Sequence, residues 1–163
     1  MQLLSTRYIS ALVIFLASVD AEAVGAGCAS GKQSLRVKIF GDSRVRLGKP
    51  VSLNVLVENT GQSELKLPKP MVPRYYWLRF QVRNEQGKVL EWRGPEPKLL
   101  YENERVSLYP EYSYGRFFNN LEEALDFSKP GKYSIRATWG IGPDGNCASG
   151  EYRSREFILH VIP

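Results

Sequence analysis

The chain has 163 residues, 43% of them hydrophobic, and a formal net charge of +5. This length and composition suit one domain with a hydrophobic core, and the chain is too short for two ordinary domains. One histidine and two cysteines exclude, in practice, a zinc site built from three or four His, Cys or acidic ligands. The positive charge favours anionic partners or serves solubility. The lysines and arginines are scattered along the sequence and form no long run, so they do not predict a nucleic-acid-binding tail.

Residues 1–23 have the pattern of a secretory signal peptide. Arg7 precedes a short apolar run at 9–17, and an A-x-A sequence follows at 21–23. The run is too short to cross a hydrocarbon core about 30 Å thick, so we expect no transmembrane segment in the mature chain. We predict cleavage near Ala23 and a secreted or periplasmic protein.

Residues 24–34 form an N-terminal segment that contains Cys28. In an oxidising compartment we expect a disulfide between Cys28 and Cys147, which would tie the mature N-terminus to a loop near the C-terminus. Closing so long a loop would stabilise the fold by about 4–5 kcal/mol in the chain-entropy model, before strain. Lipidation of Cys28 is the alternative, although Gly25 stands where a lipoprotein signal has Leu or a similar residue, and Cys147 would then lack a partner.

From residue 35 onward the sequence predicts short strands separated by turns. Alternation of apolar and polar residues is clear at 35–40 and 51–57. Asn59-Thr60-Gly61 and Asn84-Glu85-Gln86-Gly87 are typical turns, the second with Gly87 at positive φ. The other predicted strands are 65–67, 75–82, 88–92, 105–109, 114–118, 132–139 and 155–162. One short helix is expected at 121–126, and the glycine-rich segment 140–150 is expected to be a hairpin tip or a long loop.

So many short strands with almost no helix favour two antiparallel sheets packed face to face. The sequence Pro130-Gly131-Lys132-Tyr133 resembles the tyrosine corner of immunoglobulin-like sandwiches, in which the Tyr133 hydroxyl would bond to nearby backbone. The Cys…Trp…Cys spacing of antibody domains is absent. We predict an all-β, Ig-like antiparallel β-sandwich of about seven to eight strands over residues 35–163, preceded by the cleaved signal peptide.

A narrower resemblance covers residues 35–139. The segments 51–61, 94–95, 108–110, 125–127 and 130–133 are similar in order and spacing to the non-catalytic sandwich domain of deuterolysin-like and peptidyl-Lys metalloendopeptidases. Through 82–87 and 130–133 the chain also resembles, more loosely, small bacterial proteinase-inhibitor domains. The resemblance implies no peptidase activity, because the H-E-x-x-H zinc motif needs two histidines and the chain has only His160.

The sequence predicts no catalytic residue, cofactor or metal. His160 would be the only base for a Ser or Cys nucleophile, and it lies within the last predicted strand. Glu122, Glu123 and Asp126 are close in sequence, but like charges on an exposed turn are usually solvated. The loop oxygens of Asp144 and Asn146 are far fewer than the six to eight that calcium takes.

Three surfaces are candidates for binding. The first groups Tyr75, Tyr76, Trp77 and Trp92 with Arg93, residue types that concentrate at protein–protein hot spots and, for the aromatics, also stack on sugars. The second is the stretch 109–118, with Tyr112 and Tyr114, and the third is the loop 140–150, with Asp144 and Asn146. The alternatives are that the aromatic residues fill the core and that a stapled loop serves stability alone.

The sequence therefore predicts an exported, non-catalytic sandwich that binds another protein, in its most concrete form an inhibitor or neutraliser of an envelope or secreted hydrolase. A carbohydrate- or cell-wall-binding module that uses exposed aromatics and basic charge is the alternative. A structural envelope protein is a third possibility. No nucleic-acid partner is expected.

Overall fold

The computed structural model describes residues 35–69, 71–73, 77–95, 104–141 and 150–163. Over these residues the chain forms strands and one short 3₁₀ turn, η1 (Leu121–Glu123). The strands are β1 (Leu35–Gly41), β2 (Arg44–Arg46), β3 (Leu53–Asn59), β4 (Leu65–Pro68), β5 (Leu78–Asn84), β6 (Val89–Leu90), β7 (Arg105–Leu108), β8 (Ser113–Phe118), β9 (Gly131–Ile141), β10 (Gly150–Arg153) and β11 (Phe157–Ile162). Among the described residues no helix is long and apolar enough to span a membrane.

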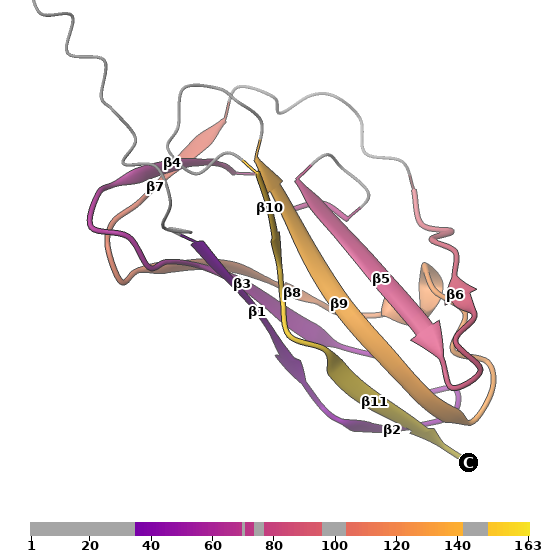
Figure 1. Ribbon diagram of the computed structural model, residues 1–163. Coiled ribbons are helices and arrows are strands. Elements are labelled where there is room, and N and C mark those ends of the chain that lie inside the picture. The colour runs from indigo at the N-terminus through magenta and orange to yellow at the C-terminus, as the bar shows by residue number, and fades with distance from the viewer. Residues whose placement is uncertain (1–34, 70, 74–76, 96–103, 142–149) are drawn as a thin grey trace, which may run out of the picture.

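Two sheets make the sandwich (Figure 1). The first has the order β1-β3-β8, and the second has the order β2-β11-β9-β5-β6, with β10 also pairing with β9. A separate pair, β4–β7, lies at one end of the molecule beyond β3 and β8. This arrangement confirms the predicted all-β, Ig-like sandwich, although the described residues form eleven strands, several of them only two to four residues long, where about seven to eight were expected.

The N-terminal strand crosses from one sheet to the other. β1 pairs antiparallel with β3, and after a break at residues 42–43 β2 pairs with β11 in the second sheet. The β2–β11 pair is parallel, whereas the other strand pairs are antiparallel. The sequence predicted neither β2 nor β10, because three or four residues are too few for a period of two to stand out.

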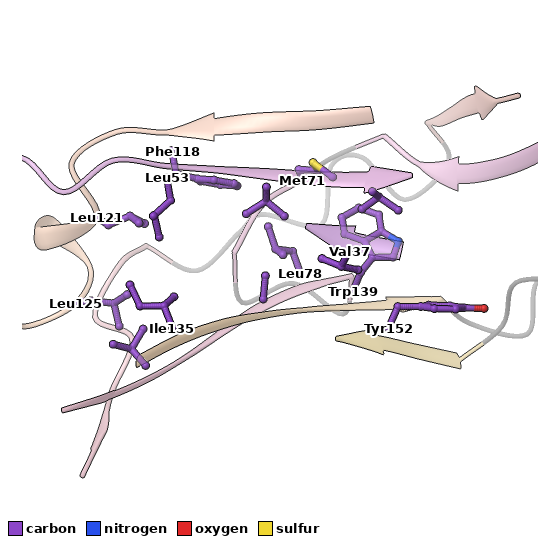
Figure 2. Packing of buried hydrophobic residues seen from close by; sticks show 14 of the residues in the cluster. Val37, Leu53, Met71, Leu78, Phe118, Leu121, Leu125, Ile135, Trp139 and Tyr152 are labelled. Carbon is purple, nitrogen blue, oxygen red and sulfur yellow. The ribbon is translucent and has the colours of Figure 1, made fainter. Parts of the chain in front are cut away.

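The core lies between the sheets (Figure 2). Trp139, Leu78 and Leu53 are fully buried within it. Leu121 and Leu125 close one end, where the expected helix at 121–126 proved wrong. Only residues 121–123 form a 3₁₀ turn there, because burial of these two leucines bends the chain across the end of the sandwich instead of leaving it as a solvated helix.

Asn59 fixes the point where β3 and β8 give way to β4 and β7. Its buried side-chain amide donates to the Ser63 and Leu108 carbonyls at 2.7 and 2.8 Å, and its Oδ1 accepts from the Gly61 N–H at 2.9 Å. The backbone of Asn59 is bonded too: its N–H donates to the Tyr112 carbonyl, and its carbonyl accepts from the Glu111 N–H. The predicted turn at Asn59-Thr60-Gly61 is thus an Asx turn that also satisfies a neighbouring strand.

Ser154 bridges a β-bulge between β10 and β11. Ser154, Arg155 and Glu156 face only Arg136 and Ala137 of β9, so the strand carries one extra residue there. The Ser154 hydroxyl accepts from the Ala137 N–H at 3.0 Å and donates to the Arg155 carbonyl at 2.7 Å. A side chain therefore completes the ladder where the backbone departs from it.

Candidate binding surface

Trp77 and Trp92, expected to belong to one aromatic group, lie in different surroundings and are both half-buried against the core. The Arg105 guanidinium lies 5.9 Å from the centre of the Trp77 ring. Trp92 instead stacks on Phe80, whose ring meets Phe118 edge-on at 5.4 Å. Tyr75 and Tyr76 lie outside the described residues.

Arg93 lies next to Trp92 at the closed end of the sandwich. Its guanidinium is 3.8 Å from the Asp126 carboxylate, and both side chains are largely exposed. Hydrogen bonds from Ser128, and then the charges of Arg93 and Lys129, lower the pKa of Asp126. This pair is a surface ion pair, a type that contributes little to stability or affinity by itself.

Tyr114 is used inside the fold rather than offered to a ligand. Its hydroxyl donates to the Lys69 carbonyl at 2.6 Å, and Arg116 on the same strand donates to the Met71 carbonyl at 3.1 Å. Both side chains reach from the edge strand β8 to the segment that runs past it. They close the side of the sandwich that β8 would otherwise leave open.

Tyr112 is exposed, with 64% of its surface accessible, and its ring meets that of Tyr109 edge-on at 6.1 Å. The turn that carries them is fixed by a Tyr112 N–H to Tyr109 carbonyl hydrogen bond and contains Glu111 in the left-handed region at φ 67°. Tyrosine is among the residue types that concentrate at protein contacts, and this turn presents two of them to solvent.

Tyr133 takes the position expected of a tyrosine corner. The residue is buried, its hydroxyl donates to the Lys129 carbonyl at 2.7 Å, and its ring meets that of Phe127 edge-on at 5.1 Å. Pro130 and Gly131 lie in the turn between Lys129 and Tyr133, with Gly131 at φ 150°. Asp144, Asn146 and both cysteines of the predicted disulfide, Cys28 and Cys147, lie outside the described residues, so the predictions for them stay predictions.

The outer face of the six-stranded sheet is strongly basic. In β9 the buried residues Tyr133, Ile135, Ala137 and Trp139 alternate with residues that point away from the core. The strand register places outward residues of neighbouring strands in rows, such as Arg79–Thr138–Arg153 and Lys132–His160–Arg44. The basic residues on this face are Arg44, Arg46, Arg79, Arg83, Lys132, Arg136 and Arg153. We call this set the basic face.

Two carboxylates neutralise part of the basic face. Glu151 contacts Arg79 and lies 3.4 Å from Arg153, and Glu156 lies 3.7 Å from Arg136. The hydrogen bond and charge of Arg79, with a smaller contribution from Arg153, lower the pKa of Glu151, which therefore stays ionised at neutral pH. In the described part of the chain no carboxylate pairs with the remaining cations of the face, Arg44, Arg46, Arg83 and Lys132.

The outer face of the three-stranded sheet has a different character. Phe40 and Phe117 are 46% and 57% exposed and flank Asn54 in one row. Leu56 leans over Gly115 in the next row, where any Cβ would fall 2.0 Å from its Cδ2 atom. The two outer faces of the sandwich thus divide into one that is basic and one with exposed aromatic rings.

The basic face consists of cations that suit the binding of an anion. Across the described ranges no three His, Cys, Asp or Glu side chains gather where they could hold a metal ion. His160 lies on the basic face between Lys132 and Arg44, with cations as its row neighbours. Sequence reasoning missed this face, although basic residues two or four apart in Arg44/Arg46, Arg79/Arg83 and Lys132/Arg136 signalled it.

No protein-family model matches the sequence, and no curated protein matches it either. Among solved structures, the chain is similar to the CARDB domain of the PF1109 protein from Pyrococcus furiosus, a crystal structure in complex with di-metal ions. The two are 21% identical, with a TM-score of 0.41, over 78% of this chain and 87% of that one. It is also similar to part of native alpha-2-macroglobulin from Escherichia coli, at 14% identity and a TM-score of 0.46, over 79% of this chain and 16% of that one.

Likeness of this degree bears on neither the family nor the activity of the chain. The predicted sandwich fold is supported by the strands and their pairing in the structure itself. The narrower resemblance to metalloendopeptidase domains and to proteinase inhibitors gains no support from these comparisons.

Proposed function

We propose that this protein is an exported, non-catalytic binding domain that docks an acidic protein against its basic face. The observation that carries the proposal is the gathering of seven lysines and arginines on one sheet face, of which Glu151 and Glu156 pair with three in the described part of the chain. Such a concentration of one charge attracts an anionic surface and orients it during association.

The composition of the basic face favours carboxylates as the groups recognised. Six of its seven cations are arginines, whose planar guanidinium binds a carboxylate through two parallel hydrogen bonds. Arg44, Arg46, Arg83 and Lys132 make no ion pair within the described residues, so they need not break one to bind a partner.

Apolar side chains within the basic face favour a protein over a polysaccharide. Ile162 and Val89 are 41% and 43% exposed, and Ile158 is half-buried beside Ser134. A protein interface combines apolar contacts of this kind with a charged rim. Neutralisation of a hydrolase in the envelope or the medium is the specific form of the proposal that the small size and the predicted export support.

An anionic cell-wall glycan is the second candidate ligand. The exposed pair Tyr109 and Tyr112 supports it, because aromatic rings stack on sugars while the basic face would meet negatively charged groups. Free sugar distinguishes the two candidate ligands, because it would displace a bound glycan and would leave a bound protein in place.

The test uses the oxidised chain from residue 24 onward, immobilised and exposed to envelope and secreted extracts. We expect one protein to be retained at near 1:1 ratio and identified by mass spectrometry. Binding of that purified protein should weaken at least about tenfold for the double variant Arg83→Glu/Lys132→Glu, which reverses two unpaired charges of the basic face. The matched control Lys49→Glu/Lys129→Glu makes the same change in net charge away from the strands of that face.

Equal weakening by both double variants would mean that net charge alone holds the partner, which would contradict the proposal. Retention of wall glycan in place of any protein, with release by free sugar, would replace it with the second candidate.

A further inference from the structure

We propose that the partner contributes an extended acidic segment that adds as a strand to the outer edge of β1, in the groove between β1 and β10. This inference rests on the proposed function, because the segment belongs to the same acidic partner. It concerns a different part of the surface, the side of the sandwich where the edges of the two sheets approach one another (Figure 1).

The outer edge of β1 is open in the described structure. β1 pairs only with β3, through all seven of its residues, and its backbone makes no hydrogen bond to another described segment. β10 likewise pairs only with β9, but it is four residues long and ends at the bulge at Ser154. The long, regular edge of β1 is therefore the better template for an added strand.

A groove runs along this edge. Two adjoining hollows of about 490 and 570 Å³ share Arg36, Val37 and Arg153 in their walls. Leu35 and Val37 are buried, and the next inward residue, Ile39, is only half-buried. An added strand would bury apolar side chains over this floor, at every second position.

The rims of the groove are basic. Arg36 and Lys38 stand on the β1 side, and Arg153 and Arg155 stand on the other side. Arg36 and Lys38 contact Glu58 at 3.6 and 2.9 Å from the neighbouring strand, so they already lean on a carboxylate within the sheet face. Only Glu151 and Glu156 oppose these four cations in the walls of the two hollows.

This charge distribution selects the occupant. Another copy of β1 would bring Arg36 and Lys38 against like charges, which is the way edge strands avoid pairing with themselves. A segment that alternates acidic and apolar residues meets the cations with one face and the apolar floor with the other. The geometry thus points to a partner segment of that alternating pattern.

The probe is a fluorescent peptide of alternating Glu and Val, about eight residues long to match the length of β1. Its binding to the whole exported chain is followed by fluorescence anisotropy. Two further peptides have the same charges, but one is N-methylated at every Glu and the other at every Val. Because a strand hydrogen-bonds to one neighbour through alternate residues, we expect one of these two to lose at least about tenfold in affinity and the other to keep it.

Protein variants supply the second arm. Lys38→Glu should weaken the unmodified peptide at least about fivefold, because the reversed charge faces the added strand, whereas Lys49→Glu/Lys129→Glu should not. Lys38 is exposed, so the variant should fold, which circular dichroism would check.

Binding of both methylated peptides as tightly as the parent peptide would overturn strand addition, since charge alone would then hold the probe. Absence of peptide binding while the partner is still retained on the basic face would also overturn it, and would leave the proposed function standing. Peptide binding with no protein partner retained would contradict the proposed function instead.

Discussion

Tyr133 illustrates how one buried phenol joins local sequence to the packing of two strands. Its hydroxyl is held by the Lys129 carbonyl, and its ring lies against Phe127. Burial, with smaller contributions from the charges of Asp126 and Glu85, raises the pKa of Tyr133 above the ordinary value of 10.0. The folded protein therefore keeps this proton to higher pH than the unfolded chain does.

A raised pKa makes the stability depend on pH in the alkaline range. The contribution of Tyr133 should be fully present below the unfolded-state pKa of about 10 and should be lost as the pH rises through the folded-state pKa. We expect the free energy of unfolding to fall more steeply between about pH 9 and about pH 11 for the native chain than for Tyr133→Phe. Urea titrations across this range would measure it, and Tyr112→Phe, at an exposed site, should follow the native chain. Identical slopes for the native chain and Tyr133→Phe would show that the prediction is wrong.

At the scale of elements, Asn59 joins two strand pairs that belong to different sheets. β3 and β8 belong to the three-stranded sheet, whereas β4 and β7 form their own pair after the bend. The side-chain amide of Asn59 serves both, through the Ser63 and Leu108 carbonyls.

Asn59→Asp should lower the free energy of unfolding by at least about 2 kcal/mol at neutral pH. The change keeps the shape of the side chain, removes both donors and places a carboxylate against two carbonyl oxygens. Chemical denaturation would measure the loss. Asn54→Asp, at a half-buried site on the outer face, is the control and should stay within about 0.5 kcal/mol of the native chain. A similar loss of stability in both variants would mean that the added charge, and not the loss of the Asn59 hydrogen bonds, causes the destabilisation.

The sequence predicted the longer elements well and the shorter ones poorly. β1, β3 and β9 are visible because each is at least seven residues long and alternates between more and less buried positions over most of its length. Short β2 has no such length, and what defines it is the neighbouring β11, which lies more than 100 residues further along the chain. The 3₁₀ turn at 121–123 was overestimated as a helix for a similar reason, since burial of Leu121 and Leu125 depends on distant strands.

At the scale of the whole molecule, folding collects charge that is scattered along the sequence. The cations of the basic face come from four separate strands, β2, β5, β9 and β10. The spacing of basic residues two or four apart marks single strands, whereas their meeting on one face depends on the register of β2, β11, β9, β5 and β10. Trp77 and Trp92, two members of the candidate aromatic group, have different neighbours in the fold, because Trp77 lies beside Arg105 and Trp92 stacks on Phe80.

An extended basic face should make association with the partner sensitive to salt. Raising the ionic strength from about 0.05 M to about 0.5 M should slow association at least about tenfold and change dissociation much less. Stopped-flow fluorescence or surface plasmon resonance would give both rates. The salt dependence should flatten in Arg83→Glu/Lys132→Glu, and an unchanged dependence in that variant would place the steering charges elsewhere on the molecule.

The passage of the N-terminal strand from one sheet to the other has a mechanical consequence. β2 runs parallel to β11, and further backbone hydrogen bonds join Leu47 to Ile162 and His160 to Ser43. Tension that pulls the start of β1 and the end of β11 apart would load these bonds along the strands, so that several must break together. An antiparallel hairpin pulled from its open end would instead unzip one bond at a time. The sandwich therefore resists stretching between the start of β1 and the end of β11 through a set of bonds that share the load.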